Sequence, residues 1–289
     1  MYKISEKNKG ILLALIGVLF ITPDSLFIRL VGIDSWQLVF YRGLIPFVCL
    51  FILLLFLYKK DFVTKFLIIG YAGILNAVLA AFGNITFVMS LANTNVANTL
   101  IMISLAPFTA ALLGSIFLKE NPNNRTWITM ILCFLFVIFI FYDSYESKQI
   151  YGDLLGLATA FLIGASAVVI RYAKKINFLP SLLLAKIFTM LLVFNFVDSF
   201  YLSNFELTLI IFMGFFLIFI PLTLITLAPR YIPAHQVQLF FVLETVLGPI
   251  WVLVFLNEMP SIKTIIGGVF IITIIFIYTL LEIRDKKNT

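Results

Sequence analysis

Apolar residues fill ten long runs of this chain, and short polar segments separate the runs. A helix needs roughly 20 mostly apolar residues to cross a bilayer, and each run meets that length. The runs cover about residues 11–31, 36–58, 66–90, 94–118, 125–142, 152–172, 179–200, 206–228, 233–256 and 262–281. The boundary between the third and the fourth run is the least distinct, because only the polar segment 91–95 separates them. The pattern predicts an all-α polytopic membrane protein with ten transmembrane helices.

The composition of the chain indicates that lipid is its solvent. Hydrophobic residues make up 62% of the 289 residues, charged residues only 12%, and the mean hydropathy is +1.12. A soluble domain carries about 25% charged residues. Cys49 and Cys133 lie inside apolar runs, which favours small buried hydrophobes over a disulfide, and a single histidine argues against a metal site. The first run contains Pro23, Asp24 and Arg29 and lacks a cleavage site, so we expect a retained span rather than a signal peptide.

Lysine and arginine are distributed unequally over the segments between the apolar runs. With the N-terminus placed in the cytoplasm, fifteen of the 20 basic residues fall on the cytoplasmic side. Only Lys148 and Lys263 fall outside, and the other three lie within spans. Because basic residues accumulate in cytoplasmic loops, we predict that both termini face the cytoplasm. The net charge of +6 reflects this bias and does not indicate nucleic-acid binding.

Two pairs of segments show that the chain contains a duplication. FLKENPNNRTWI at 117–128 and FLNEMPSIKTII at 255–266 match at six positions with a constant offset of 138. GILLAL at 10–15 matches GDLLGL at 152–157 with an offset of 142. The two copies therefore extend along most of the chain.

Each half, residues 8–142 and residues 152–282, contains five of the predicted spans. Because five is odd, the second half enters the membrane in the opposite sense to the first. The expected fold is ten transmembrane helices arranged as two inverted five-helix repeats. Such repeats place a substrate pathway at their interface, and rocking of one half against the other exposes it alternately to the two sides.

Ten spans in two such halves, with SLAPFTAALLGSIFLKE closing the fourth span and LETVLGPIWVLVFLNEMP closing the ninth, resemble the drug/metabolite transporter superfamily. The EamA-like branch is the most similar, over about residues 8–282. The resemblance implies a carrier in the bacterial inner (plasma) membrane, often an exporter of amino acids or related metabolites. It also implies that spans 1, 3, 4, 6, 8 and 9 surround a cavity, with spans 5 and 10 at the periphery.

Charges that one half carries and the other lacks are the strongest candidates for a substrate or coupling site. At the repeat offsets, Asp24 aligns with Ser166, and Glu244 aligns with Ala106. A charge deep in the bilayer costs at least ~2.5–3.5 kcal/mol, so each carboxyl group requires a partner or a wet cavity. Glu244 lies about 11 residues into the ninth span, which at 1.5 Å per residue is ~16 Å, near the middle of the bilayer. Glu244 is therefore our first candidate.

Asp24 and Arg42 are expected at the same depth below the outer ends of spans one and two, where they can pair across a tight hairpin. Two interpretations stay open: a structural salt bridge, or an outer gate or substrate-carboxylate site that involves Arg42. Lys186 in span seven has three interpretations. It faces the cavity, pairs with Glu244, or snorkels to the cytoplasmic surface.

Polar and kink-forming residues within the spans are weaker candidates. Asn76 and Asn84 are eight residues apart and share one face of span three, where they either bond to neighbouring helices or line the cavity. Gln238 is six residues from Glu244, so a continuous helix does not place them on one stripe. Prolines inside spans are predicted to supply bends or hinges, namely Pro23, Pro107, Pro221 and Pro249.

Charges present in both halves are expected to belong to the scaffold. Glu120 and Glu258 stand at equivalent span ends, where each is predicted to cap the next helix. Arg29 and Arg171 are predicted to snorkel to lipid head groups.

The function that fits these features best is secondary active transport by alternating access. No Walker-type phosphate loop is present, so a gradient rather than ATP must drive the carrier. Arg42, Lys186 and Glu244 in one cavity suit a small amino acid or an amphipathic amine-like metabolite. We expect export, with Glu244 as a candidate proton-coupling group. The alternative is uptake of a nucleotide-like metabolite such as S-adenosylmethionine.

Other classes of function fit the chain less well. An enzyme needs a nucleophile–base constellation or metal ligands, and one histidine with two scattered cysteines argues against it. A pore is the alternative from a different class, although no repeated ring of charges or carbonyl-rich filter loop is visible. We expect no cofactor, no metal and no nucleic acid. The expected partners are a small-molecule substrate and the lipid bilayer, with the protein a monomer or a homodimer.

Overall fold

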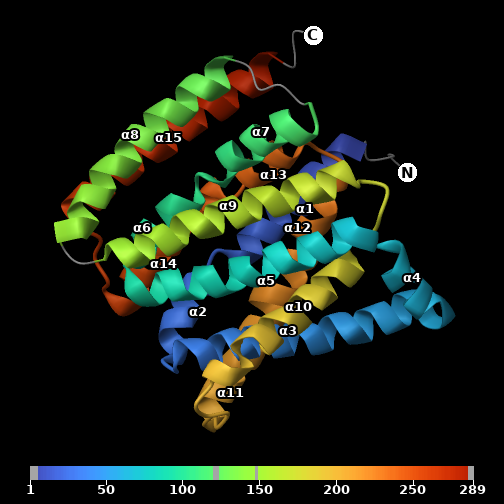
Figure 1. Cartoon of the computed structure of the whole chain (residues 1–289). Coiled ribbons are helices and arrows are strands. Elements are labelled where there is room, and N and C mark those ends of the chain that lie inside the picture. The colour runs from blue at the N-terminus through green and yellow to red at the C-terminus, as the bar shows by residue number, and fades with distance from the viewer. Residues whose placement is uncertain (1–5, 120–123, 147–148, 286–289) are drawn as a thin grey trace.

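The described part of the chain is helical throughout. The computed structural model describes residues 6–119, 124–146 and 149–285, and every regular element in these ranges is a helix (Figure 1). In chain order the α-helices are α1 (Glu6–Ile21), α2 (Asp24–Val31), α3 (Ser35–Tyr58), α4 (Phe62–Ile68), α5 (Gly70–Asn93), α6 (Val96–Ile103), α7 (Ala106–Phe117), α8 (Asn124–Glu146), α9 (Ile150–Tyr172), α10 (Leu179–Val193), α11 (Asn204–Phe212), α12 (Ile220–Leu227), α13 (Ala234–Leu239), α14 (Val242–Leu256) and α15 (Ile262–Asp285). The all-α fold predicted from the hydrophobic pattern is confirmed.

Most of the predicted spans meet the requirements for crossing a membrane. In the described residues, eight helical stretches are long and apolar enough to do so, from Glu6–Val31 to Gln236–Leu256. The predicted fifth and tenth spans contain shorter apolar stretches, Trp127–Ile140 and Ile262–Ile274. The indistinct boundary near residues 91–95 is a real break, because α5 ends at Asn93 and α6 begins at Val96. The protein is therefore a multi-pass membrane protein.

Within the described ranges, three spans are broken into two helices, and proline marks two of the breaks. Pro23 separates α1 from α2, and Pro107 lies in the first turn of α7, just after α6 ends. Proline fits a first turn because its missing N–H has no helical partner there in any case. The third break separates α13 from α14 and lies near the equivalent place in the second repeat. Pro249, by contrast, lies inside α14, which continues through it.

The eighth span changes its winding before its proline. Between α11 and α12 the chain forms a π-helical segment, Met213–Phe219, and Pro221 follows in the first turn of α12. A π-helical turn accommodates a residue that the α-helical ladder does not, which is a common way to bend a helix. Gly214 lies in this segment, and a methyl group added to it would stand 2.6 Å from Cβ of Ile45 in α3. Span eight therefore approaches α3 at a distance that only glycine permits.

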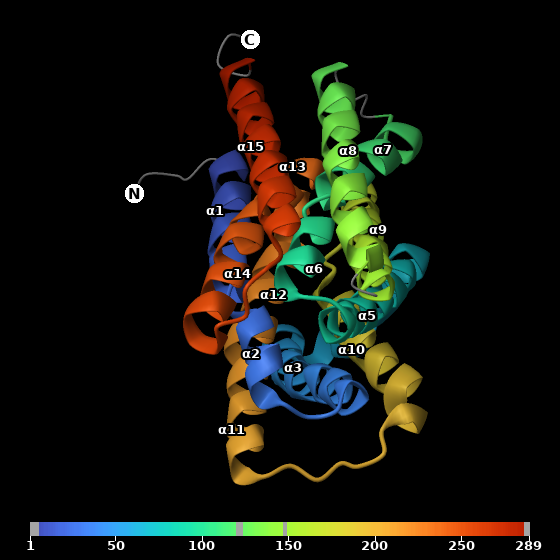
Figure 2. The same cartoon turned by 90° about the vertical axis from the view of Figure 1, so that its left-hand side faces the viewer.

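The helices form one bundle with a peripheral pair. α8 and α15 lie side by side at the edge of the bundle in both cartoon views (Figures 1 and 2). The beginning of α1 and the end of α15 lie at the same end of the molecule, which we call the terminal end. The opposite end, where α2 ends and α11 begins, is the far end (Figure 2). The resemblance placed spans five and ten at the periphery, and α8 and α15 are these spans.

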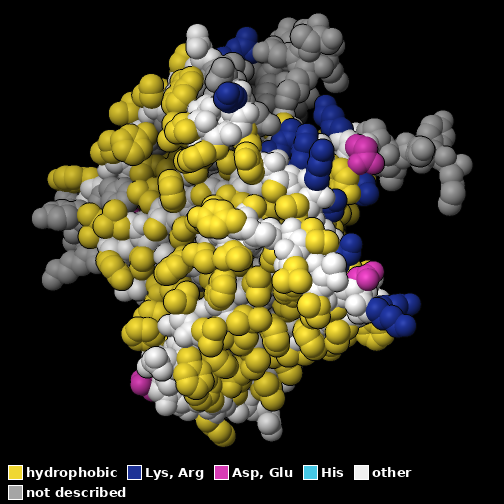
Figure 3. Space-filling model, turned by 45° about the vertical axis from the view of Figure 1, so that its right-hand side comes forward, with side chains coloured by type: hydrophobic (Ala, Val, Ile, Leu, Met, Phe, Trp, Pro, Cys, Tyr) yellow, Lys and Arg dark blue, Asp and Glu magenta, His cyan; other side chains and the backbone are white. Residues whose placement is uncertain are grey.

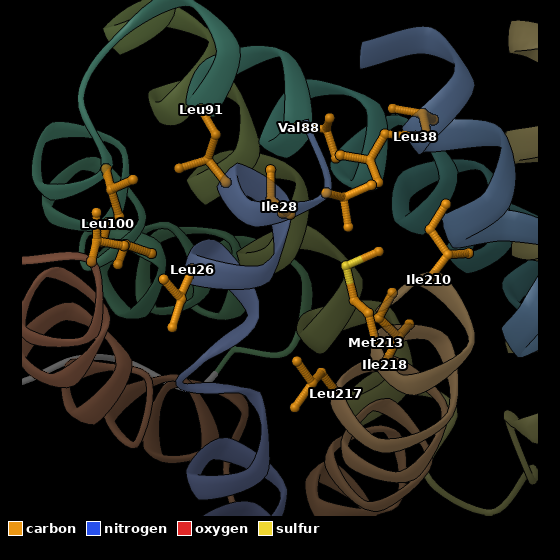
Figure 4. Packing of buried hydrophobic residues seen from close by; sticks show 14 of the residues in the cluster. Leu26, Ile28, Leu38, Val88, Leu91, Leu100, Ile210, Met213, Leu217 and Ile218 are labelled. Atoms are coloured by element: carbon orange, nitrogen blue, oxygen red, sulfur yellow. The ribbon is translucent and has the colours of Figure 1, made fainter. Parts of the chain in front are cut away.

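A cluster of buried apolar side chains joins the two halves (Figure 4). The labelled members come from α2, α3, α5, α6 and span eight, and they are Leu26, Ile28, Leu38, Val88, Leu91, Leu100, Ile210, Met213, Leu217 and Ile218. Lipid tails are as apolar as these side chains, so close packing rather than exclusion of water holds such helices together.

The surface of the bundle is apolar on its flank and basic at the terminal end. Figure 3 shows hydrophobic side chains over the broad flank, with Lys and Arg gathered beside the start of the chain. Phe56 and Leu67 are 75% and 77% exposed, as suits side chains that face lipid. Lys148, one of the two basic residues expected outside, lies beyond the described residues. The cytoplasmic location of both termini stays a prediction.

Candidate functional site: a charged cavity between the two halves

A cavity lies inside the bundle, between helices of both repeats. Its volume is about 170 Å³, well above the minimum of about 10–15 Å³ that a cavity needs to hold a single water. Most of its wall is apolar, contributed by Ile, Leu, Ala and Phe side chains of spans three, six and eight. Spans two and seven also contribute, beyond the six spans that the resemblance implied. All six residues that the sequence nominated for substrate binding or coupling line this cavity, namely Asp24, Arg42, Asn76, Asn84, Lys186 and Glu244.

Asp24 and Arg42 form a two-pronged salt bridge in the cavity wall. Arg42 Nη1 donates to Asp24 Oδ1 at 2.7 Å, and Nη2 donates to Oδ2 at 2.9 Å. Both side chains are buried, and the break after α1 places Asp24 in the first turn of α2, where a helix N-terminus favours a carboxylate. Arg42 Nε also donates to Asn84 Oδ1 at 3.2 Å, and the guanidinium lies 5.5 Å from the centre of the Phe87 ring. Arg42 is thus neutralised within the wall.

Lys186 and Glu244 are the two cavity charges without a counter-ion. Each side chain is 4% exposed, and in the described part of the chain neither has an oppositely charged group within 4.0 Å. Both lie within electrostatic range of the Asp24–Arg42 pair. Of the three interpretations of Lys186, the structure matches the cavity-facing one, because the side chain neither reaches the surface nor touches Glu244. Two buried charges of opposite sign therefore line one small space, and each is costly to leave uncompensated.

Asn76 is held by a directed chain of hydrogen bonds. Ser181 Oγ donates to the carbonyl of Gly73 at 2.6 Å, so it accepts from Asn76 Nδ2 at 3.0 Å. Asn76 Oδ1 in turn accepts from Ser166 Oγ at 2.6 Å. Asn76 thus links spans three, six and seven and lines the cavity as well, so both interpretations of this residue apply.

Gln238 lies in the cavity wall, although helical spacing ranked it low. The side chain is 3% exposed, and its Oε1 has no hydrogen-bond partner in the described structure. The spacing argument failed because α13 ends at Leu239 and α14 begins at Val242, so Gln238 and Glu244 do not share one helix. Ser166 was also missed as a site residue, although its alignment with Asp24 was a visible signal.

A second polar layer lies at the far end. Arg29 Nη2 donates to the carbonyl of Thr94 at 2.9 Å, and Arg29 Nε lies 3.4 Å from Glu258 Oε2. Glu258 Oε1 also accepts from the backbone N–H of Val96, the first residue of α6. The prediction that Arg29 snorkels is therefore wrong. Glu258 caps α6 of the first repeat, while the next helix is capped by Ser261, whose Oγ accepts from Thr264 N at 3.1 Å.

A buried carboxylate at the same end was not recognised in the sequence. Asp153, fully buried near the start of α9, accepts from Thr94 Oγ1 at 2.7 Å and from Asn98 Nδ2 at 3.2 and 3.3 Å. Asn98 Oδ1 accepts from Thr264 Oγ1 at 2.7 Å. This network ties the α5–α6 junction to α9 and α15. Glu120, the repeat equivalent of Glu258, lies outside the described residues.

Among the described residues, the lining of the cavity therefore reaches toward the terminal end and does not include the polar layer of the far end. Its lining includes Ile170 and Pro229, which lie within a few residues of the helix ends at the terminal end. None of Arg29, Thr94, Asp153 and Glu258 belongs to its lining. In the described residues, no group of three or more His, Cys, Asp or Glu side chains is placed to hold a metal ion.

Comparison with known proteins agrees with this architecture. The sequence profile of the EamA-like transporter family matches residues 8–142 and residues 150–280. A solved crystal structure is similar over 96% of this chain and 99% of its own, with a TM-score of 0.71 at 13% identity, which shows a shared fold. No curated protein matches the chain.

Proposed function

This chain belongs to the EamA-like transporter family and is a membrane transporter, and from that premise we propose that it exports a small zwitterionic metabolite by alternating access. The observation that carries the proposal is the pair of uncompensated buried charges, Lys186 and Glu244, in one largely apolar cavity. The substrate class is an amino acid or an amphipathic amine-like compound that also carries an acid group.

The chemistry of the cavity supports a substrate with both charges. An ammonium group beside Glu244 and a carboxylate beside Lys186 would each compensate a buried charge, which an uncharged or singly charged molecule cannot do. Arg42 is a poorer carboxylate partner than Lys186, since Asp24 already holds its guanidinium. The apolar wall would take the substrate's side chain, because ligand pockets are mostly apolar with a few placed polar groups. S-adenosylmethionine carries an amino-acid head as well, and it belongs in the test panel.

The proposed transport cycle uses the asymmetry between the two ends. In this conformation the far end is closed by the Arg29 and Asp153 layer, while the cavity extends toward the terminal end. With the termini in the cytoplasm, as the basic residues favour, this is a conformation that faces the cytoplasm. Rocking of the two halves would separate Arg29 from Glu258 and expose the cavity on the other side. Export as the direction rests on the family resemblance.

Glu244 is the proposed proton-coupling group of this cycle. It is a buried carboxyl with no ion-pair partner among the described residues, so its charge must be compensated by the substrate or by a proton. A carboxylate that binds the substrate in one conformation and a proton in the other would couple substrate export to proton entry.

The test is a binding screen followed by flux in proteoliposomes. Purified protein is heated with the common amino acids, their decarboxylated amines and S-adenosylmethionine, because a ligand that binds the folded state raises its stability. Flux of the best stabiliser is then measured with and without a pH gradient in wild type, Glu244→Gln and the surface control Glu6→Gln. We expect gradient-driven flux in wild type and Glu6→Gln and its loss in Glu244→Gln.

Other outcomes would contradict parts of the proposal. Gradient-driven flux in Glu244→Gln equal to that of wild type would contradict the proposed coupling role of Glu244. Stabilisation by amines alone would rule out a zwitterion. Conductance far above ~10³ events per second, the upper range of ordinary turnover, would favour a pore.

A further inference from the structure

Lys186 and Arg42 lie in corresponding spans of the two repeats, with an offset of 144, two residues more than the offset that aligns Asp24 with Ser166. α3 begins at Ser35 and α10 begins at Leu179, so each basic residue is the eighth of its helix. The two helices cross beside these residues, since a methyl group added to Gly43 would lie 3.2 Å from the carbonyl oxygen of Lys186. Both basic side chains line the cavity. Each half therefore contributes one cation to the same space.

In the part of the chain that the structure describes, only the first half supplies its cavity cation with an acid. Asp24 binds Arg42 at 2.7 and 2.9 Å, but the residue that aligns with Asp24 in the second half is Ser166. Ser166 lines the cavity, as Lys186 does. Its hydroxyl group donates a hydrogen bond to Asn76 Oδ1, and its side chain is shorter than that of an aspartate. The second half thus has the cation and a small side chain where the first half has a carboxylate.

We propose that the carboxylate of the substrate supplies the acid that the second half lacks. It pairs with the ammonium group of Lys186, in the space that serine leaves at position 166, as the carboxylate of Asp24 pairs with Arg42. Lys186 is the donor of this subsite, because an ammonium group has three N–H bonds to offer. Ser166 is a specificity-determining residue through its size rather than through a hydrogen bond to the substrate. This inference rests on the proposed function and names the subsite for one end of the zwitterion.

The first test needs no substrate and uses the protein itself. Ser166→Asp restores the missing acid, and Ser166→Asn is its match in size without the charge. Each is made with Lys186 present and with Lys186→Met, and thermal unfolding is measured for the four variants. With Lys186 present, we expect Ser166→Asp to melt several degrees above Ser166→Asn, because the new carboxylate meets the lysine. With Lys186→Met the order should reverse, because the carboxylate is then buried without a cation.

The second test asks whether the engineered acid displaces the substrate. For the amino acids that stabilise wild type, Ser166→Asp should weaken binding at least tenfold relative to Ser166→Asn. The matching amines, which lack the carboxylate, should bind the two variants about equally.

The possible failures are distinguishable. If Ser166→Asp is no more stable than Ser166→Asn with Lys186 present, or if the two bind amino acids alike, the subsite is wrong. If no zwitterion stabilises wild type but the melting order behaves as described, the geometry between residues 166 and 186 holds and the proposed substrate class is wrong.

Discussion

Arg29 and Glu258, separated by 229 residues in the chain, lie 3.4 Å apart at the far end and join the first span to the end of the ninth. Their side chains remain 29% and 28% exposed, whereas Asp24 and Arg42 are almost completely buried. Partly exposed ion pairs contribute only about 0–1 kcal/mol, and removal of one partner from a buried pair costs several times more. The Arg29–Glu258 pair therefore suits a contact that forms and breaks, and the Asp24–Arg42 pair suits a fixed element of the wall.

Removal of the Arg29 side chain should open the far end with little loss of stability. A cysteine at Ala80, which lines the cavity, reports access once Cys49 and Cys133 are replaced by alanine. We expect Arg29→Ala to accelerate its modification by a membrane-impermeant thiol reagent added on the far side.

The matched control for Arg29 is Arg230→Ala at the terminal end. Arg230 also donates to a backbone carbonyl, that of Lys174, at 3.3 Å. Its removal should leave labelling from the far side unchanged. Labelling that is equally slow in wild type and Arg29→Ala would show that Arg29 does not help to close this end.

Neutralisation of Asp24 should destabilise the protein strongly. Asp24→Asn leaves the Arg42 guanidinium buried without its counter-charge, which costs about 3–5 kcal/mol. The double variant Asp24→Asn/Arg42→Met removes the stranded charge and should melt above Asp24→Asn alone. Thermal unfolding in detergent measures both. A single variant as stable as wild type would mean that the pair is not an element of the fold.

Substitution of alanine for glycine should change the stability of the protein in opposite directions at two positions, Gly164 and Gly114. A methyl group on Gly164 in α9 would lie 2.8 Å from the carbonyl oxygen of Ala106 and 2.9 Å from the backbone N of Ala110. These backbone atoms cannot move without separating α7 from α9, so Gly164→Ala should lower the melting temperature. Gly114 in α7 has nothing within 4 Å of such a methyl group, and alanine is preferred over glycine in a helix by about 1 kcal/mol. Gly114→Ala should therefore be neutral or stabilising, and equal effects at both positions would contradict the packing of α9 on α7.

Loss of the Asp153 carboxylate should weaken the far-end closure. Asp153→Ala removes the acceptor that Thr94 Oγ1 and Asn98 Nδ2 share, although Thr94 Oγ1 keeps Gln149 Oε1 at 3.3 Å. A buried donor left without an acceptor costs about 1–3 kcal/mol. Hydrogen exchange of the α5–α6 junction should accelerate, while exchange in the distant α12 should not change. Unchanged exchange at the junction would show that the carboxylate carries little of the closure.

The charges of the cavity could be predicted because each violates the apolar pattern of its span. Asp24, Arg42, Lys186 and Glu244 stand alone in long runs of hydrophobic residues, and the cost of a charge in lipid implies an interior position. The fold class followed from the same pattern. The pairing of Asp24 with Arg42 was predictable because a short connection holds their spans together.

Contacts between distant segments could not be predicted. The helical spacing gave a wrong position for Gln238 relative to Glu244. A period of 3.6 residues holds only within one helix, and the helix breaks after Leu239. The partner of Glu258 lies in the other repeat, and no local pattern encodes which helix start a carboxylate will reach. Asp153 stands near the start of its span, where a charge looks ordinary, and only the packing of α5 and α6 against α9 buries it.

The Asp153 network has no copy in the first repeat, where the aligned residue is Ile11. If two inverted halves were identical, the shapes open to either face of the membrane would have the same energy, and the empty carrier would visit both equally. An acid that is bonded at the far end, and that aligns with an isoleucine in the other half, removes that balance. We therefore expect the conformation with a closed far end to be the more stable one in the unloaded carrier. Substrate binding must then supply the free energy for the change to the conformation that is open at the far end.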